Sequence, residues 1–528
     1  MQSLSPVQTP ELMFGLVAPI GVDLPLVSEV LAQTLTEVGY AAHAFRLTAL
    51  MREVPVGLRL DAVTHVASYK ERIAYANSLR EQLGDDALAA LTISALRSFR
   101  GSQRATLQAT GQSSNSASDL AQPEEAALPN QAYIFRQLKR PEEVALLRSV
   151  YGRQFILISA YAPEEWRRAR IERQERQSRG GLIDDVEAHS LAHELIVQDA
   201  KEAESAHGQR VRDAFALGDV FIDASSRHTC ERSLRRFVQL LFGSNEITPT
   251  HDEYGMYMAK SAALRSSDLS RQVGAAVFRA SGEVAALGCN EVPKAGGGTY
   301  WSDDDRDRRD FVEGHDPNER LKTEVLVDVL DRLLKGGHLS ADLTELEDPV
   351  KVSRHLLGES TRHSIGDSKI MDLIEFGRVI HAEMSAICDA ARQGVPIRGG
   401  TLYCTTFPCH LCAKHIVAAG IKEVVYLEPY PKSYASKLHG DAIVVDSDDP
   451  GRKVDFRAFI GVSPYRYRDL FEKGKRKYSG GEAQRWNKGT SRPMIEVNYP
   501  QYFKAEALVV SSLGGALKAM SRQPPRDS

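Results

Sequence analysis

The chain has 528 residues, of which 42% are apolar and 26% are charged, and its formal net charge at pH 7 is -4. This length predicts at least two domains, and the lack of any run of 18 apolar residues excludes a membrane-spanning helix. A pI near 6.5 argues against a general polynucleotide binder, because such a domain is usually distinctly basic.

The N-terminal segment predicts a buried strand over residues 11–17, a glycine-bearing turn and a helix over residues 26–38. This order is the setting of a phosphate-binding loop, in which backbone amides hold phosphate and a lysine reaches its oxygens. Here Leu24 stands at the lysine position and Pro25 at the hydroxyl position. We interpret the segment as a degenerate P-loop in a kinase-like domain and leave nucleotide binding there open. The residues assigned to this loop are Ala18 and Gly21.

Further strands are predicted over residues 152–160 and 219–223, with helices between the strands, which favours a doubly wound parallel sheet. Residues 101–130 are rich in Ser, Gln, Ala and Asn and predict a disordered insertion inside this domain. Arginines cluster beside Trp166, where nucleoside-phosphate kinases often carry a lid. A solvated helix face explains these arginines more simply.

In the second half of the chain, two apolar runs over residues 272–278 and 283–288 flank a short turn and predict a β-hairpin. The elements predicted after it are a helix within 372–392 that ends before Gly394, a strand over 400–406, a helix from Pro408 to Gly420 and a strand over 423–427. A hairpin followed by a helix, a strand, a helix and a strand predicts a three-layer α/β/α sandwich around a mixed sheet.

Two short motifs stand at the starts of these two helices, His381-Ala382-Glu383 and Pro408-Cys409-His410-Leu411-Cys412. One neutral imidazole and two thiolates suit Zn²⁺, and three protein ligands leave a fourth position for water, whose pKa the ion lowers to roughly 7. H-x-E followed by P-C-x-x-C is a known signature of zinc nucleobase deaminases. The motifs therefore predict a catalytic zinc site with Glu383 as the proton relay.

Each part of this pattern has a simpler explanation when it is taken alone. A single histidine before a helix is usually a cap or a packed side chain, and a lone C-x-x-C serves metal or redox chemistry. A structural zinc site would need a fourth protein ligand, and the candidates near in sequence are Cys388, Cys404, His410 and His415. None of these explanations accounts for Glu383 or for the proline before Cys409, so we prefer the catalytic site.

With these motifs, residues 255–445 resemble the deoxycytidylate deaminase family, and the resemblance also rests on the segments 264–268, 271–275 and 290–293. It implies a cytidine-deaminase-like fold in which Asn290 holds the sugar 3′-hydroxyl. It also implies that the backbone amide of Ala382 faces the pyrimidine O2, and that Glu383 relays protons to N3 and to the leaving ammonia. Ser385 stands where the family often has asparagine.

A long spacer separates Asn290 from His381, whereas small deaminases have a far shorter connection. Its residues 294–370 include a glycine run before Trp301 and alternating aspartates and arginines over 303–310, whose mixed signs do not favour a polyanion. A solvated surface insertion is one explanation for the spacer. A lid or an oligomer contact is an equally good explanation, because long loops in compact domains are often functional.

The combination of a kinase-like domain with a deoxycytidylate deaminase makes nearly the whole chain resemble the bacterial anti-phage dCTP deaminases. The segments 427–433, 437–439 and 461–465 support this resemblance. It implies conversion of free dCTP or dCMP to the deoxyuridine nucleotide, a homo-oligomer, and regulation by a small RNA. We expect Lys432 and Lys437 to bind a substrate phosphate through their positive charge.

The predicted domains are a degenerate P-loop kinase-like domain over residues 1–245, a zinc-dependent deaminase domain over 246–478, and a C-terminal extension over 479–528. Two other functions stay open. One is a housekeeping dCMP deaminase for thymidylate synthesis with an N-terminal sensor domain, and the other is a polynucleotide-editing or RNA-binding module, against which the acidic pI weighs. Six cysteines without even spacing and no recognisable secretory signal predict the reducing cytoplasm.

Overall fold

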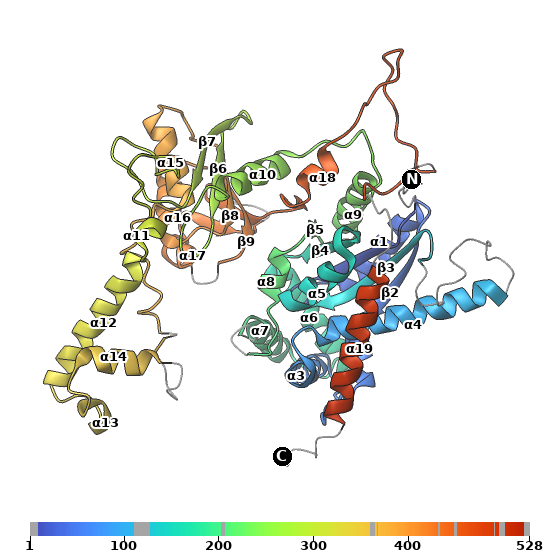
Figure 1. Cartoon of the computed structure of the whole chain (residues 1–528), viewed down its shortest axis with the longest axis horizontal. Coiled ribbons are helices and arrows are strands. Elements are labelled where there is room, and N and C mark those ends of the chain that lie inside the picture. The colour runs from blue at the N-terminus through green and yellow to red at the C-terminus, as the bar shows by residue number, and fades with distance from the viewer. Residues whose placement is uncertain are drawn as a thin grey trace. The chain divides into compact units, whose positions relative to one another are not determined.

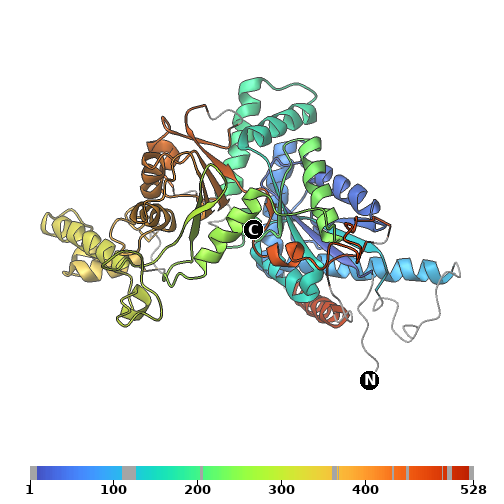
Figure 2. The ribbon, with the colours of Figure 1, turned by 90° about the horizontal axis from the view of Figure 1, so that it is seen from above.

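The structure, a computed structural model, describes residues 9–109, 127–201, 206–358, 365–366, 368–430, 433–447, 451–489, 491–495 and 502–521. The chain divides into two compact units, the first made of residues 1–253 with 460–528 and the second of residues 254–459. Each unit is built around its own sheet, as Figures 1 and 2 show. Within the described residues, no helix has both the length and the apolar character needed to cross a membrane.

The sheet of the first unit is largely parallel. Its strands are β1 (Leu12–Val17), β2 (Ala41–Arg46), β3 (Gln131–Leu138), β4 (Phe155–Tyr161), β5 (Val220–Asp223) and β12 (Gly461–Val462), in the order β12-β5-β4-β1-β3-β2. Neighbours from β5 to β2 pair in parallel, and β12 is antiparallel to β5. Every residue of β1 is buried, as its continuous apolar sequence predicts for a central strand covered on both faces.

The helices of the first unit connect these strands. They are α1 (Leu24–Thr36), α2 (Leu47–Leu50), α3 (His65–Leu83), α4 (Ala87–Ala109), α5 (Pro141–Tyr151), α6 (Glu164–Ser178), α7 (Asp185–Lys201), α8 (Val211–Ala216), α9 (Arg227–Leu241), α18 (Tyr467–Phe471) and α19 (Tyr502–Met520). Helices α1 and α9 share one core with Leu12, Phe14 and Leu16 of β1. Helices α3, α4, α5 and α19 pack against one another in a second group.

The α/β character predicted for this unit is confirmed, as are the strands expected at β1, β4 and β5. Its kinase-like character stays a prediction. The disordered insertion predicted over residues 101–130 is wrong at both ends, because α4 continues to Ala109 and residues 127–130 lead directly into β3. Residues 110–126 lie outside the described part of the chain. Just before this segment, α4 carries a buried arginine.

The buried arginine is Arg100, whose side chain is fully enclosed with two carboxylates. Its Nη2 lies 3.0 Å from Oε2 of Glu11, and its Nη1 lies 2.9 Å from Oε2 of Glu506 on α19. Tyr133 and Tyr502 donate further hydrogen bonds to Glu11. This cluster joins Glu11, near the start of the chain, and Glu506, near its end, to Arg100 and Tyr133.

We expect the substitution Arg100→Met to lower the free energy of unfolding by about 3–5 kcal/mol, because it leaves two buried carboxylates without their cation. Urea unfolding followed by circular dichroism measures the change. The control is Arg153→Met, which removes an arginine that is 61% exposed and paired with Asp469. A surface pair of this kind contributes about 0–1 kcal/mol, so equal effects of the two substitutions would contradict the prediction.

The predicted domain boundaries need correction. Residues 460–478, predicted as part of the deaminase domain, and residues 479–528, predicted as a separate extension, both belong to the first unit. Strand β12 extends its sheet, and α19 packs against α4. A two-residue strand and a buried ion cluster have no recognisable sequence pattern. The contacts of residues 460–528 with the first unit could therefore not be predicted from the sequence.

The second unit contains a mixed sheet with the order β10-β11-β9-β8-β6-β7. Its strands are β6 (Gly274–Phe278), β7 (Val284–Cys289), β8 (Thr401–Thr406), β9 (Glu423–Glu428), β10 (Ile443–Val445) and β11 (Val454–Ala458). The predicted hairpin is confirmed as the antiparallel pair β6 and β7, whereas β8, β9, β11 and β10 pair in parallel. The predicted strands over 400–406 and 423–427 are also confirmed.

Helices cover both faces of this sheet. Helices α15 (Ala382–Arg392) and α16 (His410–Ala418) share a core with Ala275 and Val277 of β6. On the other face, α10 (His251–Ala263) brings Tyr254 against Phe278, with ring centroids 5.9 Å apart. A short helix, α17 (Ala435–Leu438), packs against α16. The second unit therefore has the three layers that the order of its elements predicts.

Two helix starts differ from the predicted ones. The helix expected within residues 372–392 begins only at Ala382, since residues 372–381 are turns that form part of a cavity wall. The following helix begins at His410, so Pro408 lies before the helix and not in its first turn. Gly394 has a positive φ of 69° directly after α15, in agreement with its predicted role as a C-terminal cap.

The spacer 294–370 contains helices between Asp310 and Leu357, where the sequence prediction treated it as a long loop. It forms α11 (Asp310–Glu313), α12 (Pro317–Lys335), α13 (Ala341–Thr344) and α14 (Pro349–Leu357). Leu326 and Leu330 of α12 pack with Val352 of α14, so the spacer has a small core of its own. Figures 1 and 2 show α12 and α14 side by side. Leu326, Leu330 and Leu333 of α12 recur at helical spacing, so the sequence did contain a helix signal here, and the prediction missed it.

Candidate active site

The two sequence motifs meet at the N-terminal ends of α15 and α16. His381 is the N-cap residue of α15, and Cys409 is the N-cap residue of α16. Cys412 lies one turn further along α16 and is fully buried. Helix N-termini carry amide groups without partners in the helix and a positive dipole end, which favours thiolate over thiol.

These three side chains form a group that could hold a metal ion. Their ligand atoms lie within 4.8 Å of one another. The His381 Nδ1 atom is 3.2 Å from the Cys409 Sγ atom and 3.4 Å from the Cys412 Sγ atom. Tetrahedral zinc with bonds of about 2.3 Å to sulfur and 2.0 Å to nitrogen would separate nitrogen from sulfur by about 3.5 Å. The donor set and its spacing therefore fit Zn²⁺.

The three groups share their protons through hydrogen bonds. The hydrogen bond from Cys412 lowers the pKa of Cys409 to about 4. The hydrogen bond with Cys409 raises the pKa of His381 to about 9. The pKa of Cys412 is raised, because its thiol donates to Cys409 and is buried. Binding a cation at this site therefore requires His381 and Cys412 to give up their protons.

The candidates for a fourth ligand do not join this group within the described residues. Cys388 is exposed on α15, and Cys404 is buried within β8. His410 lies near Glu375, with 3.9 Å between Nε2 and Oε1, and the Nδ1 atom of His415 bonds to the Leu411 carbonyl. Three protein ligands leave a coordination position for water, as in catalytic zinc sites.

Glu383 lies in the first turn of α15 and is only 4% exposed. Burial raises its pKa, while the nearby His381 opposes that shift. A raised pKa makes a carboxylate a better proton acceptor, as an acid–base group requires. Glu383 thus combines the burial, the position and the proton affinity that an acid–base group needs.

A glycine sets the position of α15 against the sheet. A Cβ atom at Gly288, on β7, would collide with the Ala382 carbonyl oxygen and the Ala386 amide nitrogen. Only a residue without a side chain lets the first turn of α15 approach the strand this closely. The strand therefore helps to fix the helix turn that carries Glu383.

A cavity of about 340 Å³ opens beside these residues and is lined by His381, Ala382 and Glu383. Asn290 also lines the cavity, as the sequence predicts for a substrate-binding residue. Its Oδ1 atom accepts a hydrogen bond of 2.7 Å from the Val273 amide, and its Nδ2 atom donates one of 2.8 Å to the Arg271 carbonyl. Asn290 therefore also fixes the loop that precedes β6.

The sequence prediction missed several residues of this cavity. Arg271 lines it, with its guanidinium 5.4 Å from the centroid of the Tyr430 ring. Phe407, which follows β8, lines the cavity too. An arginine within the predicted motif segment 271–275 was the available signal, but a single arginine is too common to be singled out.

The spacer also contributes to the cavity. Asp310, Asp316 and Asn318 line it, although they lie 60 or more positions before His381 in the sequence. Asp310 is buried and ion-paired with Arg378 at 3.0 Å, and burial raises its pKa. Part of the spacer therefore forms a wall of the site, a role that differs from the surface insertion, the lid and the oligomer contact considered for it. Nothing in the sequence pattern of the spacer indicated these contacts.

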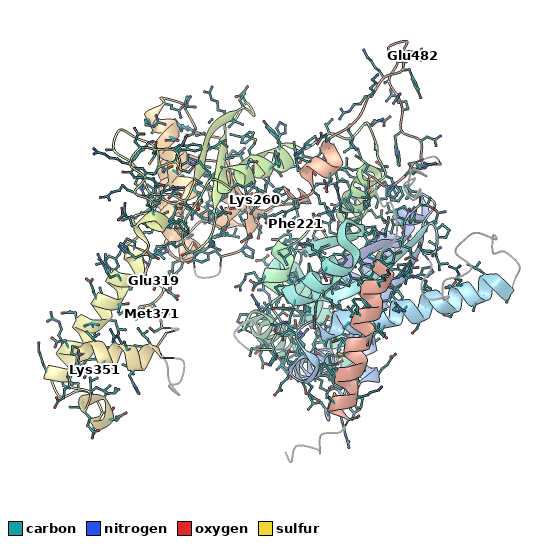
Figure 3. All side chains as sticks on the ribbon, viewed as in Figure 1. Phe221, Lys260, Glu319, Lys351, Met371 and Glu482 are labelled. Atoms are coloured by element: carbon teal, nitrogen blue, oxygen red, sulfur yellow. The ribbon has the colours of Figure 1, made fainter. Side chains whose placement is uncertain are left out.

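Asn318 fastens the segment that leads to His381. Its Nδ2 atom donates to the Leu373 carbonyl at 2.9 Å, and its Oδ1 atom accepts from the Phe376 amide at 3.2 Å. One turn later, Lys322 donates to the Met371 carbonyl at 2.8 Å. Figure 3 labels Met371 and the neighbouring Glu319 of α12. The first turns of α12 thus hold the cavity wall formed by residues 371–377.

For the deamination that the sequence motifs predict, we expect Asn318→Ala to raise the KM for the substrate about tenfold and to change kcat less than threefold. The substitution removes two hydrogen bonds, each contributing about 0.5–1.5 kcal/mol, from a wall that holds substrate and does not react. Steady-state kinetics measures both constants. The control is Asp328→Asn, which changes a side chain that is 61% exposed on the same helix. Equal KM changes in the two variants would contradict a positioning role for Asn318.

Of the two lysines expected to bind phosphate, Lys437 does not line this cavity. Lys437 is exposed, its ammonium lies 5.9 Å from the centroid of the Tyr434 ring, and it is not among the residues that line the cavity. Lys432 lies outside the described residues. Among the described residues, Arg271 is the arginine that lines the cavity.

Comparisons with known proteins agree with this geometry. The family profile described as "Cytidine and deoxycytidylate deaminase zinc-binding region" matches residues 249–428. A probable deoxycytidylate deaminase of Drosophila melanogaster is 31% identical over 148 residues, which cover 26% of this chain and 68% of the relative. The deoxycytidylate deaminase of Enterobacteria phage T2 is 54% identical over 54 residues, which cover 10% of this chain and 29% of the relative.

The sequence matches and the structural match each cover less than half of this chain. For three of the curated relatives, the chain spans only 35%, 29% and 28% of their length. Among solved structures, the dCMP deaminase from the cyanophage S-TIM5 is 17% identical, with a TM-score of 0.21, and the alignment covers 40% of this chain and 99% of that one. At this TM-score, the structural likeness supports no functional conclusion.

Proposed function

Because this chain belongs to the cytidine and deoxycytidylate deaminase family, we propose that it hydrolyses free deoxycytidine nucleotides, dCMP and dCTP, to deoxyuridine nucleotides and ammonia. The observation that carries this proposal is the meeting of His381, Cys409 and Cys412 beside a buried Glu383 in one cavity. Family membership supplies the class of reaction, and the cavity supplies the groups that it needs.

The cofactor is Zn²⁺, and His381, Cys409 and Cys412 are the residues that we propose to hold it. When bound there, zinc supplies the Lewis acidity that makes water a nucleophile near neutral pH. We assign the proton transfers to Glu383. It takes one proton from the attacking water as the C4–O bond forms and delivers it to N3. It then takes the remaining proton from the C4 hydroxyl and passes it to the amine, so that the C4–N bond breaks to give the C4 carbonyl and ammonia.

The remaining cavity residues are assigned to binding. The Ala382 amide, in the first turn of α15, is proposed to donate to the pyrimidine O2, because amides there have no partner within the helix. The second N–H of the Asn290 side chain is proposed to bind the sugar 3′-hydroxyl. Arg271 is proposed to bind a substrate phosphate, which a free nucleotide has and a nucleoside lacks.

A substrate panel tests this function. We expect ammonia release from dCMP and dCTP, with kcat/KM at least about tenfold higher than for deoxycytidine, because a charge-assisted contact contributes about 1.5–3 kcal/mol. Arg271→Gln should remove this preference and leave deoxycytidine turnover unchanged. Activity confined to single-stranded DNA would contradict the proposal and favour a polynucleotide-editing enzyme.

The cellular role that we propose is the depletion of deoxycytidine nucleotides during phage infection. The resemblance of nearly the whole chain to the anti-phage dCTP deaminases supports this role, and a homo-oligomer and control by a small RNA are part of the same proposal. Cells that express the wild-type chain should give fewer plaques than cells that express Glu383→Gln. Equal plaque counts would contradict the defensive role.

A second role is equally consistent with the comparisons, because the relatives named above are deoxycytidylate deaminases. As a housekeeping enzyme, the chain would supply dUMP for thymidylate synthesis. This role predicts that dCMP is preferred over dCTP and that the chain relieves a thymidine requirement in cells lacking their own dCMP deaminase. The plaque assay and this growth assay together distinguish the two roles.

A further inference from the structure

The first unit contains a second cavity, of about 460 Å³, at the carboxyl ends of its parallel strands. It is formed by the turns that follow three neighbouring strands, at Asp23 after β1, at Ala162 after β4 and at Ser225 after β5. From β1 the chain continues toward β2, whereas from β4 it continues to β5 on the opposite side. Ligands of open α/β sheets bind in the crevice at such a topological switch point. We call this space the switch-point cavity.

The switch-point cavity includes Gly21 of the predicted phosphate loop, but its arginines come from α6 and α9. The Ile20 amide donates to Oδ2 of Asp199, on α7, at 3.2 Å, so a carboxylate of the protein already accepts from this loop. Lys139 donates to the Ala18 carbonyl at 3.1 Å and lies 3.7 Å from Asp199. Gly21 has a φ of 90°, and a Cβ atom there would collide with Arg167 of α6. Gly21 therefore packs closely against α6 and lines the switch-point cavity, whereas Ala18 is bonded to Lys139 and is not among the lining residues.

The charge of the switch-point cavity favours an anion. Its lining includes more cationic than anionic side chains, namely Arg167, Arg170, Arg173 and Arg227 against Asp23 and Glu165. Arg170 is held by an ion pair with Asp23 at 2.7 Å, which orients it at the cavity. Arg173 is exposed one turn further along α6, and within the described residues it takes part in no ion pair. Planar guanidinium groups bind phosphate oxygens through paired hydrogen bonds.

An aromatic side chain lies beside these arginines. Trp166 lines the cavity and is 54% exposed, although it belongs to a helix that is otherwise strongly polar. Packing does not explain this exposed indole, whereas a flat ring next to cationic groups suits a nucleobase attached to phosphates.

We propose that the switch-point cavity binds a nucleoside phosphate, with its phosphates against Arg170 and Arg173 and its base against Trp166. This site is separate from the deaminase cavity in chain position and in lining residues. The proposal does not rest on the deaminase function, since no residue of the zinc group takes part in it.

Calorimetric titration of the full-length, zinc-loaded protein tests the proposal with ATP, GTP, dTTP and inorganic tripolyphosphate as probes. Deoxycytidine nucleotides are left out, because they would also enter the proposed deaminase cavity. At least one nucleotide is expected to bind with a stoichiometry near one. Arg173→Gln should weaken this binding about 10- to 100-fold, the effect of losing one hydrogen bond to a charged group.

The matched control is Arg168→Gln, which removes one positive charge from the same helix but from a residue outside the cavity lining. It should leave the affinity within about twofold of the wild type. Both variants should keep the circular-dichroism spectrum and the melting temperature of the wild type, which shows that each is folded. Failure of every probe to bind, or equal weakening by the two substitutions, would overturn the proposal.

The role of Trp166 is tested separately. A nucleotide should bind more tightly than tripolyphosphate, and Trp166→Ala should remove that difference without weakening tripolyphosphate binding. Equal affinities for nucleotide and tripolyphosphate in the wild type would overturn the assignment of the base to Trp166.

Discussion

Replacement of Glu383 by glutamine is expected to lower kcat for dCMP about 10³- to 10⁴-fold and to leave one zinc ion per chain. Glutamine keeps the size of the side chain but cannot accept a proton, and positioned acid–base groups contribute up to about 10⁴-fold. Glu383 is not a member of the metal-binding group, so zinc should stay bound. Ammonia release measures turnover, and atomic emission spectrometry measures the metal.

The control for this substitution is Glu375→Gln, a change of the same kind at a carboxylate that is 45% exposed and lies near His410. It should keep nearly full activity. If Glu383→Gln retained more than about a tenth of the wild-type kcat, Glu383 would not be the proton relay. Loss of zinc together with activity would instead assign Glu383 to the metal.

The second large effect is expected for Cys412→Ala, which should reduce bound zinc from about one ion per chain to near zero and abolish turnover. Cys412 is buried, and its Sγ atom is 3.4 Å from His381 Nδ1, so no neighbouring water can easily replace it. Two remaining ligands hold zinc far more weakly than three, and added zinc should not restore the rate at micromolar concentration.

Cys388→Ala provides the matched control. This cysteine is exposed on α15, the same helix that carries Glu383, and lies outside the metal-binding group. Its removal should leave both zinc content and turnover unchanged. A Cys412→Ala protein that still bound one zinc ion with wild-type affinity would show that the metal lies elsewhere.

The sequence predicted the residues at the centre of the site because their relationships are local. His381 and Glu383 are two positions apart at one helix start, and Cys409 and Cys412 are three apart at the next, so each pair is fixed by a single helical turn. Strand β8, which lies between the two helices in the sequence, then brings the two pairs of residues to the same end of the sheet's strands. These are short-range rules that a residue pattern can express.

The parts of the site that the sequence did not predict depend on long-range packing. Asp310 and Asn318 reach the cavity only because α12 folds back on the segment before His381, and a charged spacer has no pattern that specifies this contact. The true start of α15 was missed for the same reason. Residues 372–381 do not form a helix, and the Leu373 carbonyl and the Phe376 amide bond instead to the side chain of Asn318. The domain boundaries failed because β12 has only two residues.

The return of residues 460–528 to the first unit makes the second unit an insertion within it. During synthesis, the ribosome therefore finishes the zinc-binding unit before it makes strand β12 and Glu506. Until then, Arg100 and Glu11 lack the third partner of their cluster, and the first sheet lacks strand β12. Since domains fold as units while the chain emerges, we expect the inserted unit to fold first and the surrounding unit to be completed last.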